Sequence, residues 1–133
     1  MKTDKQNLVL NPTNLVKKSQ FVPFHQKLKW IIEENESTVI FCPEIDQFPN
    51  KFMLAKTLDD SFHTLRRTLK FGIVEPRNIK TKHVKALVFF WYDDGESIRD
   101  IDRKLDAIKI LCLWLNKPGM VKSADFYLAE RDN

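Results

Sequence analysis

The chain has 133 residues, which suits one domain, and its 43% hydrophobic and 30% charged residues are typical of a folded globular protein rather than a disordered one. Three glycines exclude a glycine-rich phosphate loop, and the longest apolar runs are too short to span a bilayer. Two widely separated cysteines and only a short apolar run near the N-terminus indicate a cytoplasmic protein with reduced thiols.

The net charge of +4 is concentrated in one segment. Residues 63–85 carry seven basic side chains and one acidic side chain, residues 1–62 are balanced, and residues 86–133 carry seven basic and nine acidic side chains. A basic excess confined to one segment is typical of a surface that binds phosphate groups. A solvated charged loop would show the same run, so the charge pattern leaves both interpretations open.

The first third of the chain predicts a polar arm, two helices and a strand. Residues 11–13 (Asn-Pro-Thr) start a helix, because asparagine caps free N–H groups and proline suits the first helical position. Pro23 ends that helix, and residues 24–34 predict a second helix with one apolar face. Residues 37–45 are rich in β-branched and aromatic side chains and predict a strand.

The middle of the chain predicts two helices separated by an acidic turn. Residues 52–58 form the first helix and residues 59–60, both aspartate, form the turn. A second helix over residues 61–71 has a serine as its N-cap and closes at Gly72, which suits a left-handed conformation. Its apolar and basic side chains fall on two separate faces.

Two strands are predicted after this helix. Residues 73–75 form a short strand, and residues 76–78 form a bend. Residues 80–92 form a long strand whose second half is apolar on both faces and is therefore expected to be buried on both sides.

The C-terminal part predicts a long helix and a final strand. Ser97 caps a helix over residues 98–116 that a Lys-Pro-Gly sequence stops, and residues 120–130 add a strand. The helix carries an apolar heptad stripe, which indicates either a buried core face or a dimer seam. The wide apolar surface at the end of the helix favours the dimer, with a seam formed by Ile101, Leu105, Ile108, Cys112 and Leu115.

The central helices resemble the helix-turn-helix of bacterial winged-helix regulators of the GntR type. The shared pattern is Phe48-Pro49 at the start, a Leu54-Ala55 pair, a serine cap at Ser61, and then Thr64-Leu65-Arg66. The resemblance implies a winged helix-turn-helix over residues 23–92, in which the two strands after the second helix form the wing.

The predicted fold is therefore α+β, in a single domain over residues 1–133. A winged helix-turn-helix core carries an N-terminal helical extension and a long C-terminal helix over residues 97–116. The alternative is a ferredoxin-like βαββαβ sandwich over residues 38–129, in which exposed aromatic side chains at residues 89–91 would stack on RNA bases.

The predicted function is that of a DNA-binding protein without enzymatic activity. We expect a small transcriptional regulator, or a replication factor of a plasmid or mobile element, that binds double-stranded DNA as a homodimer. A recognition helix would enter the major groove while basic side chains of the wing hold the backbone. The alternatives are an RNA- or single-strand-binding protein and a protein-interaction module. The predicted DNA-binding residues are Ser61, His63, Thr64, Arg66, Arg67, Lys70, Arg77, Lys80 and Lys82.

Catalytic chemistry has one candidate, the sequence Tyr92-Asp93-Asp94 after a predicted strand, which is similar to the carboxylate pair of metal-dependent polymerases. An acidic turn before a helix is explained by capping alone. The three histidines and two cysteines lack metal-ligand spacing. No catalytic residue, metal or cofactor is therefore predicted, nor a membrane partner or a small-molecule effector domain.

Overall fold

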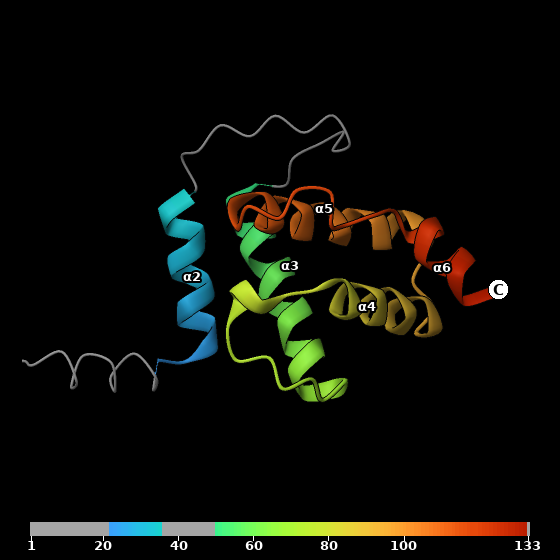
Figure 1. Ribbon diagram of the computed structural model, residues 1–133, viewed down its shortest axis with the longest axis horizontal. Helices are drawn as coiled ribbons and strands as arrows, with labels where there is room; N and C mark the ends of the chain where they lie inside the picture. The colour runs from blue at the N-terminus through green and yellow to red at the C-terminus, as the bar shows by residue number, and fades with distance from the viewer. Residues whose placement is uncertain (1–21, 36–49, 133) are drawn as a thin grey trace, which may run out of the picture.

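The computed structural model describes residues 22–35 and 50–132 (Figure 1). Helices account for 74% of these residues, and no strand occurs among them. The predicted strand over residues 37–45 and the helix start at residues 11–13 lie outside the described residues. The elements in chain order are α2 (Phe24–Asn35), α3 (Lys51–His63), the π-helical turn η1 (Thr64–Thr68), the 3-10 turn η2 (Pro76–Asn78), α4 (Thr81–Asp93), α5 (Ile98–Trp114) and α6 (Ala124–Asp132).

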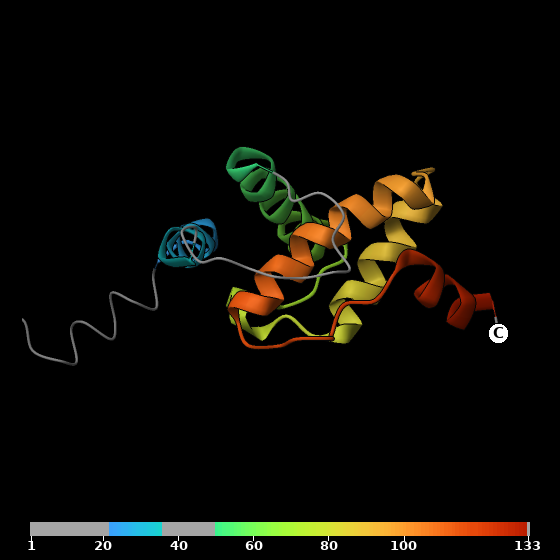
Figure 2. The same cartoon turned by 90° about the horizontal axis from the view of Figure 1, so that it is seen from above.

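α5 is the centre of the helical assembly. It packs against α2, α3, α4 and α6, and Figure 1 shows it above α4, with α2 and α6 at opposite ends of the molecule. Seen from above in Figure 2, α5 crosses α3 and converges with α4 at the turn that joins them. The buried apolar side chains of all these helices form one core.

The predicted α+β fold is wrong in both of its versions. A winged helix needs a sheet to form its wing, and a ferredoxin-like sandwich needs four strands, but the structure forms helices or irregular backbone wherever it describes the predicted strands. Residues 73–75 are irregular, residues 80–92 lie almost entirely in α4, and most of residues 120–130 lie in α6.

α2 confirms the helix predicted over residues 24–34. Its apolar side chains at i, i+4, i+7 and i+8 are all buried, as the spacing predicts: Phe24, Leu28, Ile31 and Ile32.

The predicted acidic turn is absent, because residues 51–68 form one continuous helical segment. Asn50 caps α3, accepting a hydrogen bond from the Met53 N–H at 2.9 Å. Asp60 pairs within the helix with Lys56 at 2.8 Å, a spacing of four residues that stabilises helix rather than turn. The stripe of apolar side chains continues through the expected turn, and Leu54, Leu58, Phe62 and Leu65 are all buried. The helix-turn-helix is therefore not formed.

α3 ends in a π-helical turn. The Leu69 N–H donates to the Thr64 carbonyl oxygen at 2.9 Å, a five-residue step that widens the helix over residues 64–68. Lys70 then adopts a left-handed conformation with φ of 61°, so the segment closes at Lys70 and not at Gly72 as predicted.

α4 replaces the long predicted strand. Val84, Leu87, Val88 and Trp91 are buried at a helical spacing of i, i+3, i+4 and i+7. A run that is apolar at nearly every position satisfies the period of a strand and of a helix equally, so contacts with α5 and α6 decide between them.

α5 confirms the predicted long C-terminal helix at Ile98–Trp114, but its heptad stripe is not a dimer seam. Ile101, Leu105, Ile108 and Cys112 are at most 2% exposed because they pack inside the chain's own core, and Leu115 is half-buried. The prediction of a homodimer therefore loses the surface on which it depended.

α6 forms where the last strand was predicted. Asp102 of α5 accepts a hydrogen bond from the Ala124 N–H at 2.8 Å, which satisfies one of the free donors at the start of α6. Tyr127 is fully buried and fixes the preceding loop, because its hydroxyl accepts from the Lys122 N–H at 3.0 Å. Within the residues described, none of the helices has the length and apolar character needed to cross a membrane.

Candidate nucleic-acid interface

The predicted DNA-binding residues fall into two groups in the structure. One group lies at the end of α3 and on η1, and the other lies between η2 and the first turn of α4. In Figure 1 both groups are in the half of the molecule opposite α6. One predicted residue, Ser61, is 3% exposed and faces the interior, because its hydroxyl donates to the Thr57 carbonyl oxygen at 2.7 Å. The prediction that Ser61 contacts DNA is therefore wrong.

The first group is presented by the π-helical turn. Arg66, Arg67 and Lys70 are exposed, as is His63, while Thr64 is half-buried. The Arg66 guanidinium lies 4.6 Å from the centre of the Phe24 ring of α2, which holds this cation at the surface through a cation–π contact.

The second group surrounds the N-terminus of α4. Arg77, Lys80 and Lys82 are exposed there, and Lys117 joins them from the loop after α5. The Lys117 ammonium donates to the Arg77 carbonyl oxygen and, at 2.9 Å, to the Ile79 carbonyl oxygen. Sequence reasoning missed Lys117, because nothing local to a Lys-Pro-Gly helix stop indicates that it folds back onto residues forty positions earlier.

The pKa of His83 responds to these nearby cations. It is 5% exposed, and its Nδ1 accepts a hydrogen bond from the Lys80 N–H at 2.8 Å, which caps α4. Burial lowers the pKa of His83 below 6.5, and the positive charges of Lys82, Lys80 and Lys117 lower it further. The free N–H groups at the start of α4 add a partial positive charge to the same surface.

The two groups are joined by an aromatic contact. The Phe71 ring, which follows Lys70, meets the His83 ring edge-on with centres 4.9 Å apart, and η1 packs against α4. We call the surface that they form the basic face. It consists of Arg66, Arg67, Lys70, Arg77, Lys80, Lys82 and Lys117.

Most of these cations lack a carboxylate partner. Of the seven basic side chains in residues 63–85, only Lys85 forms a recorded ion pair, with Glu130 of α6 at 3.0 Å, as far as the described residues show. Elsewhere in the described residues, basic side chains are commonly paired with carboxylates. Those that form such ion pairs are Lys27, Lys56, Arg103, Lys104, Lys109 and Arg131.

The opposite end of α4 is acidic. The turn after α4 carries Asp93, Asp94 and Glu96, so charge changes sign along this helix. Asp93 accepts two hydrogen bonds from the Arg131 guanidinium at 2.8 and 2.9 Å, which lowers the pKa of that carboxyl group. No group of three or more metal-binding side chains occurs in the part of the chain that the structure describes. Asp93 pairs with Arg131, and Glu96 pairs with Lys104 at 2.6 Å.

Comparison of the chain with protein-family models, with curated proteins and with solved structures gave no match in any of the three. The resemblance to GntR-type regulators thus gains no support from relatives, and the fold that it implies is not the fold of this chain.

Proposed function

We propose that the chain binds double-stranded DNA through the basic face, mainly by contacts with the phosphate backbone. The observation that supports this proposal is the set of six exposed cations of residues 63–85 that have no carboxylate partner within the described residues. Lysine and arginine side chains that neutralise phosphates release bound counterions, and this release supplies most of the sequence-independent affinity.

Charge polarity also favours this mode of binding. The basic end of α4 would face the phosphates while its acidic end, with Asp93 and Asp94, points away, so a polyanion would be steered to one side of the molecule. The N-terminus of α4 would add N–H donors and the positive end of its dipole. This arrangement uses no wing and no separate recognition helix.

The proposal is tested with a double variant on the basic face. We expect Lys80→Gln/Lys82→Gln to weaken duplex binding and to lower the slope of log K against log salt by about 1.8, since each lost phosphate contact removes about 0.9. The measurement is fluorescence anisotropy of a labelled duplex at several salt concentrations.

The matched control is Arg99→Gln/Arg103→Gln, which removes the same charge from exposed positions at the start of α5. We expect it to leave the slope unchanged. Equal losses in both double variants would show that only net charge matters, and salt-independent binding of the wild type would contradict the proposal. Tighter binding of RNA than of duplex DNA would instead support the RNA-binding alternative.

A further inference from the structure

A cavity of about 570 Å³ opens between α2 and the segment that leads into α4. This volume lies within the range of about 300–1,000 Å³ that is usual for small-ligand sites. The polar and aromatic side chains that line it are Lys27, Trp30, Glu33, Glu34, Glu75 and Arg77.

Trp30 gives the cavity an aromatic surface. Its side chain is 48% exposed, although tryptophan is usually buried, and the other two tryptophans of the chain are less exposed. Trp91, for example, is 4% exposed in the core. An exposed indole at the edge of a basic surface is the type of side chain on which unpaired bases stack.

The charges of the cavity divide into one neutral pair and three groups without a partner. Lys27 forms an ion pair with Glu75, so these two side chains cancel each other. Glu33, Glu34 and Arg77 have no ion-pair partner within the residues described. The cavity therefore offers a guanidinium donor and two carboxylate acceptors around an aromatic ring.

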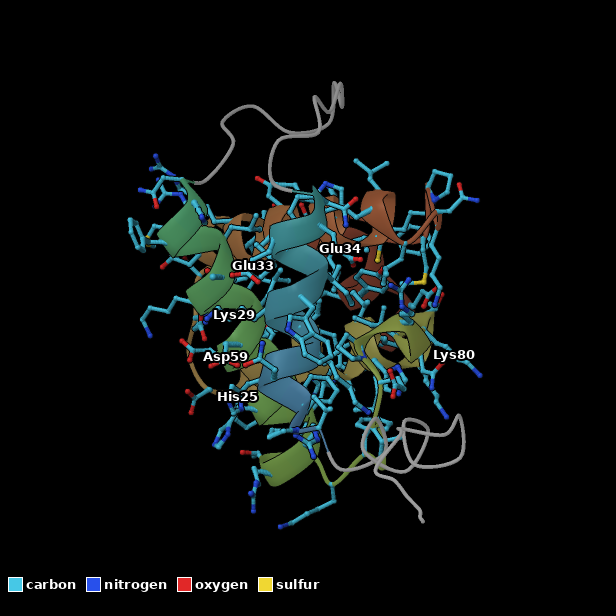
Figure 3. All side chains as sticks on the ribbon, turned by 90° about the vertical axis from the view of Figure 1, so that its left-hand side faces the viewer. His25, Lys29, Glu33, Glu34, Asp59 and Lys80 are labelled. Carbon is cyan, nitrogen blue, oxygen red and sulfur yellow. The ribbon has the colours of Figure 1, made fainter. Side chains whose placement is uncertain are left out.

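Arg77 belongs both to the cavity and to the basic face. Lys117 donates to its carbonyl oxygen, and Lys80 follows three residues later at the cap of α4. Figure 3, which looks onto α2, shows Lys80 beyond one edge of this helix and Glu34 on the side nearer to it. The other edge carries Glu33, Lys29 and His25. The cavity is thus continuous with the surface proposed to hold phosphates.

We infer that the cavity takes an unpaired nucleotide of the DNA that is bound on the basic face. The base stacks on Trp30, the flanking phosphate pairs with Arg77, and the Glu34 carboxylate accepts from the exocyclic amino group of the base. This inference rests on the proposed DNA-binding function. It also disfavours uracil, since a carboxylate accepts from cytosine N4 but is repelled by the O4 carbonyl oxygen of uracil.

A cationic occupant, such as an arginine side chain of a protein, explains less of the cavity. It would stack on Trp30 and pair with Glu33 or Glu34, but it would leave Arg77 without an anion. A nucleotide carries an aromatic ring, an amino group and a phosphate, and so it uses Trp30, Glu34 and Arg77. Glu33 is exposed on the other edge of α2 (Figure 3).

The test uses three labelled DNAs that differ only at one end: a blunt duplex, the duplex with a cytosine overhang, and the duplex with a uracil overhang. We expect the cytosine overhang to raise affinity about 5- to 100-fold over the blunt end, and the uracil overhang to raise it less. Trp30→Leu should remove this gain and leave blunt-duplex binding unchanged. Glu34→Gln should reduce the preference for cytosine, because an amide can also donate to uracil O4.

The matched control is Tyr92→Leu, because Tyr92 is an aromatic residue with the same 48% exposure at the acidic end of α4. It should change none of the three affinities. Equal overhang binding by Trp30→Leu and Tyr92→Leu would overturn the nucleotide site, while salt-dependent binding of the blunt duplex would still support the proposed function. Quenching of the part of the tryptophan fluorescence that Trp30→Leu removes, by N-acetylarginine amide but not by the overhang, would also overturn it in favour of a cationic occupant.

Discussion

Lys70 is held in a left-handed backbone conformation, with φ of 61°, at the point where the π-helical turn ends. This conformation costs an L-residue roughly 1–2 kcal/mol, whereas glycine has no Cβ to clash. Glycine gives back about 0.5–1 kcal/mol because it is freer in the unfolded chain. We therefore expect Lys70→Gly to raise the free energy of unfolding by about 0.5–1 kcal/mol.

The same substitution removes one cation from the basic face. Urea denaturation should show the gain in stability, while duplex titration should show weaker binding, with a salt slope lower by about 0.9. Asn116→Gly is the matched control, because Asn116 has φ of 60° after α5 and carries no charge. It should stabilise the fold by a smaller amount, since asparagine tolerates this conformation, and leave the salt slope unchanged.

Two outcomes would refute this reasoning. A Lys70→Gly protein that is less stable than the wild type would show that contacts of the lysine side chain outweigh its backbone strain. An unchanged salt slope would show that Lys70 does not contact phosphate. Lys70 would then no longer belong to the basic face.

Two further predictions concern the cap of α4 and the core. Because the folded state lowers the pKa of His83, the unfolded state binds the proton more readily, and the free energy of unfolding should fall as the pH drops below about 6.5. The fall, followed by urea denaturation, should be smaller in His83→Gln, and equal falls would contradict this prediction. Leu105→Ala should lower the free energy of unfolding by about 2–5 kcal/mol, since Leu105 is fully buried. Its denaturation midpoint should not depend on protein concentration. A midpoint that rises with concentration would instead support the predicted homodimer.

The spacing of apolar residues predicted the amphipathic helices, but it failed in the segment where the spacing fits a helix and a strand equally. α2 and α5 each have one apolar face between polar ones, and their predicted positions agree with the structure within a few residues. Residues 84–91 are apolar at nearly every position, so the sequence alone did not distinguish a doubly buried strand from a helix. The β-branched and aromatic side chains favoured a strand by propensity, and packing against η1, α5 and α6 outweighed that preference.

The missing turn at residues 59–60 has a different origin. Two adjacent aspartates before a serine match a turn followed by a helix cap, and the resemblance to winged-helix regulators supported that interpretation. The spacing of Lys56 and Asp60 and the apolar stripe from Leu54 to Leu65 fit one continuous helix equally well. The structure forms that helix, with the Lys56–Asp60 ion pair and the buried stripe. The position of a serine does not show whether its hydroxyl caps a helix or bonds to the previous turn, as that of Ser61 does.

The sequence predicted which basic residues belong to the candidate site. It did not predict which other side chains the fold brings to the same surface. The six basic residues from Arg66 to Lys82 were identified by their excess charge, and all six are exposed in the structure. The contributions of Lys117 and Trp30 depend on the tertiary structure: Lys117 reaches back from the end of α5, and Trp30 of α2 lines the same cavity as Arg77. No spacing rule connects positions that far apart along the chain.

Within the described residues, the cations from Arg66 to Lys82 have no carboxylate partner, and this favours a binding surface over a solvated loop for the basic segment. Like charges held together on a folded surface lower stability through mutual repulsion, and a left-handed lysine adds backbone strain at the same place. A fold selected for stability alone would relieve both, as it does where Lys85 meets Glu130. The variants expected to weaken DNA binding, Lys80→Gln/Lys82→Gln above all, should therefore be as stable as the wild type or more stable. That combination of lost binding with retained stability is expected of a binding surface and not of a solvated structural loop.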